Sequence, residues 1–333
     1  MTFAPTSAPT GVLASIPSPE ISRFFIGPVP IHFYALCIIA GIIVATLLTN
    51  HRLTKRGGEP WVVIDICLLA IPIAIVGARI FHVVTHPGFY FGEGSNPWNP
   101  FEPGSVWAIW EGGIAIYGAL LGGAVGAYLG CRWTGIRFWT FADALAPGLI
   151  IAQAMGRFGN WFNQELFGLP TDLPWGLEID SENSAFPPGL EPGTLFHPTF
   201  LYEVLWNLFG AAVIILAARA FTLQWGRTFG LYLVWYSAGR IIWETIRIDP
   251  SEVFFGLRTN VWAAIAGVIL GLVIMIVQKR RHTGYEPSAY MPGREPQGVG
   301  AVHSPDPHDF VDVSEPPATK DPVGSATSSS VTK

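Results

Sequence analysis

Seven stretches of this sequence are apolar, and each is close to the ~20 residues that a helix needs to cross the hydrocarbon core of a membrane. Charged residues make up only 13% of the chain, whereas a soluble domain carries about a quarter. The pattern therefore predicts an all-α fold, a polytopic membrane bundle of about seven transmembrane helices. The segments cover approximately residues 31–50, 61–85, 112–131, 139–155, 199–220, 228–246 and 259–278.

Basic residues in the connections predict the orientation of this bundle, because cytoplasmic loops of membrane proteins are enriched in lysine and arginine. Basic residues follow the first, third, fifth and seventh segments, whereas residues 86–111 and 171–196 contain none. We therefore expect the N-terminus outside and the C-terminus in the cytoplasm. The residues concerned are Arg52, Lys55, Arg56, Arg132, Arg137, Arg219, Arg227, Lys279, Arg280 and Arg281.

Composition divides the chain into three parts. Residues 1–25 are expected to be a flexible outer tail, because the first twenty contain no lysine or arginine and are rich in Pro, Ser, Thr and Ala. Residues 26–281 are expected to form the transmembrane domain, with outer loops at 86–111 and 156–198. Residues 282–333 hold eight prolines and seven acidic residues against three basic ones, which predicts a disordered cytoplasmic tail.

A polar segment at residues 156–168 interrupts the apolar pattern directly after the fourth span. It places Arg157, two asparagines, one glutamine and one glutamate among three glycines. Such a segment cannot face lipid, and unwound backbone at membrane depth is tolerated only where it is buried in protein or lines a wet cavity. We expect its glycines to permit positive φ and Arg157 to offer a planar fork of donors to a phosphate.

Ionisable residues inside the other spans are further candidates, since each costs about 2.5–3.5 kcal/mol on insertion. Arg240 and Glu244 are four residues apart and therefore share a helix face, which Arg247 extends toward the outer surface. Arg240 is expected to be a second phosphate clamp that faces Arg157. The alternative is a structural ion pair between Arg240 and Glu244.

Two other charged residues in spans have simpler interpretations. Asp143 lies at the start of the fourth span, where we expect it to cap the helix. For Arg79, two interpretations remain open: the side chain snorkels toward the membrane surface, or it belongs to the anion site.

The polar segment resembles the signature of the prolipoprotein diacylglyceryl transferase family. The likeness rests on Gly156, Arg157, Gly159, Asn160, Asn163, Glu165 and Gly168. It extends over roughly residues 25–280, with further matching residues at His32-Phe33-Tyr34, Trp110-Glu111-Gly112-Gly113, His197-Pro198, Tyr236 and Gly239 to Glu244.

This resemblance implies an activity and a location. A member of this family transfers the diacylglyceryl group from phosphatidylglycerol to the thiol of the lipobox cysteine of a prolipoprotein, the first step of lipoprotein maturation. The reaction forms a thioether and releases glycerol phosphate. The protein would be a multi-pass protein of the bacterial cytoplasmic (inner) membrane, and its partners would be phosphatidylglycerol, other membrane lipid and the prolipoprotein signal peptide, with no nucleic acid. We expect no cofactor and no metal.

The resemblance also implies site residues. Arg157 and Arg240 are the expected phosphate ligands and catalytic residues. The expected substrate-binding residues are Arg157, Asn160, Asn163, Glu165, Gly168, Tyr34, Tyr236, Glu244 and Arg247.

Position 117 departs from the family pattern. Many relatives have a histidine there, a candidate general base, whereas this chain has Tyr117. A free thiol is mostly protonated at neutral pH, so the reaction needs a base or a strongly positive field. A tyrosine hydroxyl is itself protonated at neutral pH, and we therefore expect Tyr117 to hydrogen-bond and not to deprotonate. His197 is the other candidate base, although His197-Pro198 equally fits a helix start.

A secondary transporter for an anionic solute is the alternative function, since such proteins bind their substrates with broken helices near the midplane of the membrane. No internal repeat relates residues 30–155 to residues 199–280, and the polar segment lies at the outer edge. These two observations favour the transferase.

Overall fold

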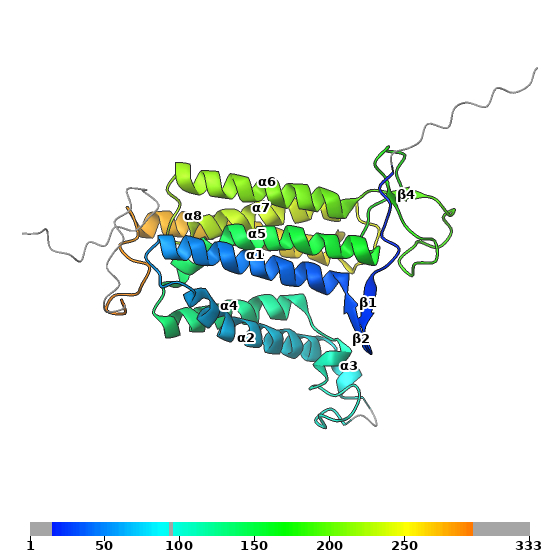
Figure 1. The fold of residues 1–333 in the computed structure, drawn as a ribbon, viewed down its shortest axis with the longest axis horizontal. Helices are drawn as coiled ribbons and strands as arrows, with labels where there is room; N and C mark the ends of the chain where they lie inside the picture. Colours follow the sequence, from blue (N-terminus) through cyan, green and yellow to red (C-terminus); the bar gives the residue numbers. More distant parts are fainter. Residues whose placement is uncertain (1–14, 93–95, 296–333) are drawn as a thin grey trace, which may run out of the picture.

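The computed structural model describes residues 15–92 and 96–295, and it shows an all-α membrane protein (Figure 1). Five of its helices are long and apolar enough to cross a membrane: α1 (Phe33–Lys55), α2 (Val62–Thr85), α5 (Phe138–Asn163), α6 (Thr199–Ala220) and α8 (Thr259–Arg281). Two further long helices, α4 (Ile116–Thr134) and α7 (Arg227–Glu244), complete the bundle. The short helix α3 (Pro87–Tyr90) and the single 3-10 turn η1 (Ile109–Glu111) lie in the connection from α2 to α4.

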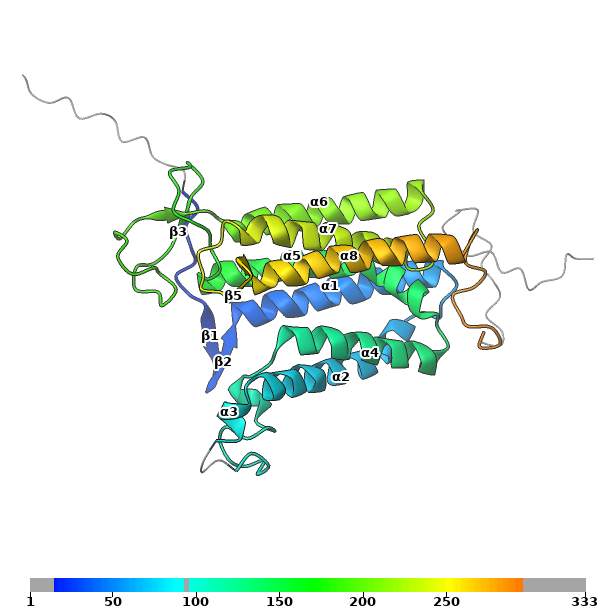
Figure 2. The same cartoon turned by 180° about the vertical axis from the view of Figure 1, so that it is seen from behind.

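Three small antiparallel ribbons lie at one end of the bundle, which we call the hairpin end (Figures 1 and 2). The opposite end carries the basic carboxyl-terminal turns of α1 and α8, and we call it the basic end. The ribbons pair β1 (Arg23–Ile26) with β2 (Val29–His32), β3 (Leu177–Glu178) with β4 (Leu195–Phe196), and β5 (Val253–Phe254) with β6 (Leu257–Arg258).

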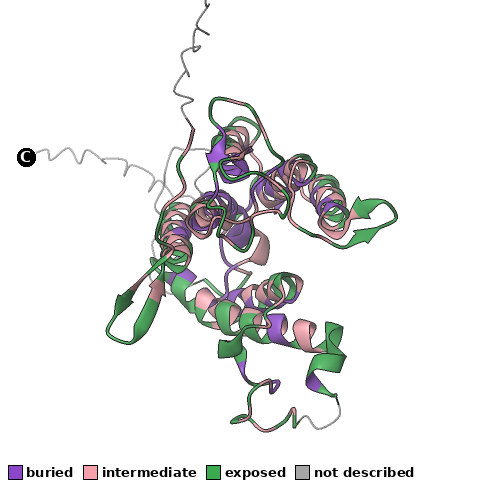
Figure 3. Cartoon of the chain, turned by 90° about the vertical axis from the view of Figure 1, so that its right-hand side faces the viewer, coloured by how far each residue is buried: buried purple, intermediate pink, exposed green. Residues whose placement is uncertain are grey.

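Helix α5 is the centre of the larger part of the bundle, where it packs against α1, α6 and α7. Twelve of its residues are buried. Seen end-on, the buried residues gather in the middle of this group and the exposed ones face outward (Figure 3), as expected for helices that present apolar side chains to lipid.

The fourth predicted span needs a correction. The sequence predicted it as the shortest, at residues 139–155, but α5 has 26 residues and continues to Asn163. The first part of the polar segment is therefore helical, not unwound. The positive φ angles fall on Gln164 (51°) and Leu166 (59°), and not on any of the three glycines of this segment. Arg157 pairs with Glu203 of α6, whereas Asn160 and Asn163 donate to Glu165 of the same segment. A single sequence does not display the contact between helices.

Helices α2 and α4 form a tight pair through glycines spaced four apart on α4. All four are buried, and they face small residues or backbone of α2. A Cβ added at Gly126 would lie 2.7 Å from the Cα of Ala70, and one at Gly130 would lie 2.9 Å from the Cα of Ile66. Such small-residue contacts let helix backbones approach closely in membranes. The four glycines are Gly118, Gly122, Gly126 and Gly130.

Residues 282–294, which we call the strap, pack against the basic end. The sequence predicted disorder from residue 282, but Glu286 is only 1% exposed. Its carboxylate accepts hydrogen bonds from Thr140 Oγ1 and from the backbone N–H of Trp225, each at 2.7 Å. The start of the predicted tail is thus part of the folded domain, whereas residues 296–333 lie outside the described part of the chain.

The strap also reaches two other connections. Tyr290 Oη accepts a hydrogen bond from the backbone N–H of Glu59 at 2.8 Å. The Nε of Arg137 donates to the carbonyl oxygen of Tyr290 at 2.7 Å. The strap therefore ties together the α1–α2, α4–α5 and α6–α7 connections.

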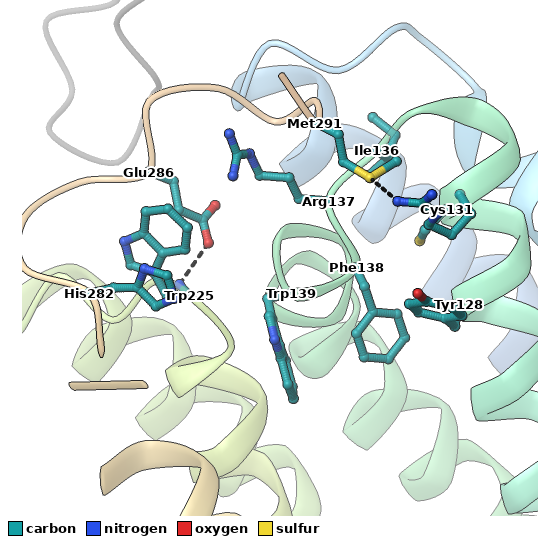
Figure 4. A pocket seen from close by; sticks show the side chains of 11 residues that line it. Tyr128, Cys131, Ile136, Arg137, Phe138, Trp139, Trp225, His282, Glu286 and Met291 are labelled. Carbon is teal, nitrogen blue, oxygen red and sulfur yellow. Dashed lines mark hydrogen bonds between the residues drawn. The ribbon is translucent and has the colours of Figure 1, made fainter. Parts of the chain in front are cut away.

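A pocket of about 270 Å³ lies at the basic end, with the strap as one wall (Figure 4). Trp225 and His282 stack there, with ring centroids 3.9 Å apart. Because it lies at the far end of the bundle from residues 156–168, this pocket is not part of the predicted anion site. It is lined by Tyr128, Cys131, Arg132, Ile136, Arg137, Phe138, Trp139, Trp225, His282, Glu286 and Met291.

Replacing Glu286 by alanine is expected to destabilise the protein by about 1–3 kcal/mol, because one buried and one partly buried donor lose their acceptor. Thermal unfolding in detergent measures the effect as a lower transition temperature. Glu295→Ala, at an exposed position beyond the strap contacts, is the matched control. Equal transition temperatures for the two variants would contradict the structural role of the strap.

Two further predictions need correction, one about the N-terminal tail and one about Asp143. Part of the predicted N-terminal tail is ordered, since Ile16 pairs with backbone groups of Gly176 and Glu178 at 2.9 Å; residues 1–14 lie outside the described range. Asp143 caps a different helix from the one predicted. Its two carboxylate oxygens accept from the backbone N–H groups of Gly226 and Phe229, each at 2.8 Å, at the start of α7.

Candidate functional site

Charged side chains from three helices meet near the hairpin end. Arg157 lies six residues before the end of α5, Glu203 in the first turns of α6, and Arg240 four residues before the end of α7. At ~1.5 Å per residue, each lies within about 10 Å of its helix end. Because α6 runs antiparallel to α5 and α7, the start of α6 and the ends of the other two helices bring these side chains to one depth.

Glu203 joins the two arginines that the sequence predicted as phosphate ligands. Its Oε2 lies 2.7 Å from Nη2 of Arg157 and 3.3 Å from Nη1 of Arg240. The carboxylate side chain is 4% exposed, whereas each guanidinium side chain is 15% exposed. One shared carboxylate thus holds two like charges side by side and leaves both partly accessible.

Glu244 is the second junction of the cluster, and its side chain has no exposed surface. Its Oε2 pairs with Nη2 of Arg240 at 2.7 Å and with Nη1 of Arg247 at 3.4 Å. Its Oε1 pairs with Nε of Arg258 at 3.4 Å. The predicted Arg240–Glu244 pair is therefore present, and it belongs to a larger set.

Asp249 closes this set by accepting from two arginines. Its Oδ1 lies 2.7 Å from Nε of Arg247, and its Oδ2 lies 3.2 Å from Nη2 of Arg258. We call the connected group the arginine network. Its four guanidinium groups face three carboxylates, which leaves one positive charge in excess. The members are Arg157, Glu203, Arg240, Glu244, Arg247, Asp249 and Arg258.

The predicted polar residues of segment 156–168 adjoin this network. Asn160 accepts from Nη1 of Arg157 at 3.2 Å and donates to Oε1 of Glu165 at 2.9 Å. Asn163 donates to the same glutamate oxygen at 3.3 Å. The structure therefore brings Arg157, Asn160, Asn163 and Glu165 together, with Asn160 and Glu165 fixing the position of the guanidinium.

Gly168 lies where two backbone segments cross. Its N–H donates to the carbonyl oxygen of His197 at 3.0 Å. A Cβ at this position would lie 2.7 Å from Cβ of His197 and 3.1 Å from the carbonyl oxygen of Ile246. The close approach explains the glycine and places it beside the loop that carries Arg247.

Tyr117 reaches the network through a residue that the sequence analysis missed. Its hydroxyl donates to Oδ1 of Asn260 at 3.2 Å, and Nδ2 of Asn260 donates to Oε1 of Glu244 at 3.0 Å. Arg258 and Asp249 were also missed. Asn260 opens the last apolar span, and a polar residue at that place is indistinguishable from an ordinary helix-start residue.

The other predicted residues lie nearby, but the described residues show no hydrogen bond from them to the network. Tyr34 packs its ring against Gly159, where a Cβ would overlap it. Tyr236 lies one helical turn before Arg240, so the two share a face of α7. His197 Nδ1 lies 3.2 Å from the hydroxyl of Tyr202.

Arg79 is not part of the network. Its guanidinium donates to backbone carbonyl oxygens of Val106 at 2.8 Å and of Ser105 and Gly112 at 2.7 Å each. It therefore organises the connection from α2 to α4 and does not face Arg157.

The arrangement suits the binding of an anion near the hairpin end. A guanidinium carries five N–H donors, and Arg157 and Arg240 each direct two of their nitrogens to protein acceptors. Partly exposed guanidiniums with donors to spare provide the bidentate recognition that phosphate groups favour.

Comparison with known proteins gives concordant matches. The family model described as Prolipoprotein diacylglyceryl transferase matches residues 22–277. A phosphatidylglycerol–prolipoprotein diacylglyceryl transferase of Leifsonia xyli is 61% identical over 289 residues, covering 85% of this chain and 86% of the relative. Proteins of the same name are 46% identical in Streptomyces coelicolor, over 87% of both chains, and in Bifidobacterium adolescentis, over 80% of both chains.

Proposed function

Because this chain belongs to the prolipoprotein diacylglyceryl transferase family, we propose that the arginine network is the place where it acts on its lipid substrate. The chain is a transferase of the membrane, and it moves the diacylglyceryl group from phosphatidylglycerol to prolipoproteins. The comparisons give the transporter alternative no support.

The pairing of Arg157 and Arg240 by Glu203 is the observation that carries this assignment. In the reaction, a sulfur–carbon bond forms as the bond between that carbon and a phosphate oxygen breaks. Negative charge then grows on the departing glycerol phosphate, and the thiol proton that is lost balances this added charge. Guanidiniums fixed in advance stabilise charge that develops in the transition state, so Arg157 and Arg240 bind and neutralise the leaving phosphate.

The acceptor in this proposal is the thiol of the lipobox cysteine in the prolipoprotein signal peptide. The partly exposed guanidiniums of Arg157 and Arg240 favour the thiolate near the reacting carbon. Tyr117 is assigned to hydrogen bonding. His197 is assigned a structural role at the edge of the site, since it contacts Tyr202 and the backbone of Gly168.

Asn160, Asn163, Glu165 and Gly168 are assigned to shaping the wall around the headgroup. Glu244 and Arg247 are assigned to holding Arg240 in place. Tyr34 and Tyr236 are assigned to the apolar approach for the diacylglyceryl part, since their rings lie beside Gly159 and Tyr232.

Seven spans in the bacterial cytoplasmic membrane are the topology that we propose. Helices α4 and α7 have 19 and 18 residues, or about 27–28 Å at ~1.5 Å per residue, close to the ~30 Å hydrocarbon core. Basic residues cluster at the basic end, opposite the network, and the basic end is therefore the cytoplasmic one in this topology. The network accordingly faces outward, where exported prolipoproteins arrive, and the C-terminus lies in the cytoplasm.

The test is transfer of labelled diacylglyceryl from phosphatidylglycerol to a lipobox peptide by the purified full-length chain in detergent micelles. We expect a thioether product that is absent with a peptide whose lipobox cysteine is replaced by serine, because the weaker oxygen nucleophile is not activated by the site. Equal product from the serine peptide would contradict a thiol acceptor. A transporter would show no product and would need a sealed vesicle to act.

A further inference from the structure

Asn260 has a fixed orientation between Glu244 and Tyr117. Glu244 is surrounded by the guanidiniums of Arg240, Arg247 and Arg258 and is therefore ionised. An ionised carboxylate only accepts hydrogen bonds, so Asn260 must turn its amide nitrogen to Glu244, at 3.0 Å. The amide oxygen is then left for Tyr117.

The orientation of Asn260 also fixes the role of the Tyr117 hydroxyl. An amide oxygen only accepts, so the tyrosine must direct its one proton to Asn260, at 3.2 Å. The oxygen of Tyr117 keeps its lone pairs. Within residues 15–92 and 96–295, no group donates a hydrogen bond to this oxygen, and it is half-buried. Tyr117 thus offers an acceptor that no described residue uses.

We propose that Glu244 and Asn260 hold Tyr117 as a hydrogen-bond acceptor for a hydroxyl group of the lipid headgroup. Tyr117 would then determine specificity, and Asn260 would be its positioning residue. The inference rests on the proposed binding of the phosphate at Arg157 and Arg240. Phosphate oxygens are acceptors and cannot satisfy the tyrosine, whereas the glycerol headgroup of phosphatidylglycerol carries hydroxyl donors.

Lipid choice tests this inference directly. Phosphatidylmethanol has the same phosphodiester as phosphatidylglycerol but no headgroup hydroxyl, so we compare kcat/KM for the two lipids with the full-length chain. Tyr117→Phe is expected to reduce the phosphatidylglycerol-to-phosphatidylmethanol ratio about tenfold, which lies in the upper part of the range for the loss of one neutral hydrogen bond. Asn260→Leu is expected to reduce it similarly. A variant that lowers both rates equally, with the ratio unchanged, would overturn the proposal.

A double variant that combines Tyr117→Phe with Asn260→Leu shows whether Asn260 acts through Tyr117 or independently of it. If Asn260 acts only through Tyr117, the double variant reduces the ratio by about tenfold, no more than either single change. A reduction of about 100-fold would mean that the residues act separately and would overturn the positioning role. Asn50→Leu is the matched control, because Asn50 Oδ1 accepts from the backbone N–H of Trp61 at the basic end; the lipid ratio should not change.

Tyr117→His gives a test that does not depend on the folding of an Asn260 variant. A neutral imidazole can donate to Asn260 with one nitrogen and accept with the other. The lipid ratio should therefore persist at pH 8 and fall as the imidazole becomes protonated below about pH 6.5, while the ratio of the natural chain stays constant. A pH-independent ratio in Tyr117→His would overturn the acceptor role.

The proposed function and this inference fail in different ways. Full transfer by an Arg157→Gln variant would show that the network is not the phosphate site. Loss of transfer in Arg157→Gln together with an unchanged lipid ratio in Tyr117→Phe would leave the site standing and reject only the role of Tyr117.

Discussion

Replacing Arg157 by glutamine should lower kcat/KM for transfer from phosphatidylglycerol by about 10²–10³-fold, the usual loss when one fixed donor to a developing negative charge is removed. Arg157 pairs with Glu203 and donates to Asn160, so it is held in place before the lipid arrives. Glutamine keeps a polar side chain but loses both the charge and the planar fork. The measurement is initial-rate transfer to a lipobox peptide in micelles.

Two further variants make this result interpretable. Arg157→Lys keeps the charge but not the bidentate geometry, and its activity should fall between those of the natural chain and of Arg157→Gln. Arg280→Gln removes an exposed arginine at the basic end and should have no effect. If Arg157→Gln kept more than about a tenth of the activity, the leaving phosphate would not depend on this guanidinium.

Replacing Glu244 by glutamine should destabilise the folded chain by about 3–5 kcal/mol, because three guanidiniums around a fully buried carboxylate each lose one of their two carboxylate partners. In thermal unfolding this corresponds to a transition about 10 °C lower. Transfer activity should fall as well, since Arg240 loses its 2.7 Å partner. Both properties are measured on the same detergent-purified samples.

Glu252→Gln is the control for this substitution. Glu252 lies at the same end of the bundle but is exposed, and exposed charges contribute little to stability. Similar transition temperatures for Glu244→Gln and Glu252→Gln would contradict the view that Glu244 organises the network.

The long apolar segments were predictable because each one carries its own signal. The segment at 199–220 matches α6 to the residue, since Pro198 and the charged turn at Arg219 mark its ends. Glycine and polar residues at 156–163 suggested a break, but their partners Glu203 and Glu165 keep them on a helix. Glu165 is local, but Glu203 comes from α6, so local propensity could not reveal its contact with Arg157.

The arginines of the site were predictable, and the residues that position them were not. Arg157 stood out in a polar segment directly after an apolar span, and Arg240 stood out because charge is costly inside a membrane span. Asn260 meets Tyr117 across 143 positions of sequence, and nothing local distinguishes it from an ordinary helix-start residue. The four-residue repeat of glycines on α4 was also missed, although it is present in the sequence.

The strap gives the basic end an order of assembly. A chain is synthesised from its N-terminus, so Glu59, Thr140 and Trp225 are made long before Glu286 and Tyr290, the residues that bond to them. These three contacts can therefore form only after the strap has been synthesised. The arginine network, whose last member is Arg258, is already encoded before the strap leaves the ribosome. The two ends are therefore synthesised in sequence, with the arginine network of the hairpin end first and the strap of the basic end last.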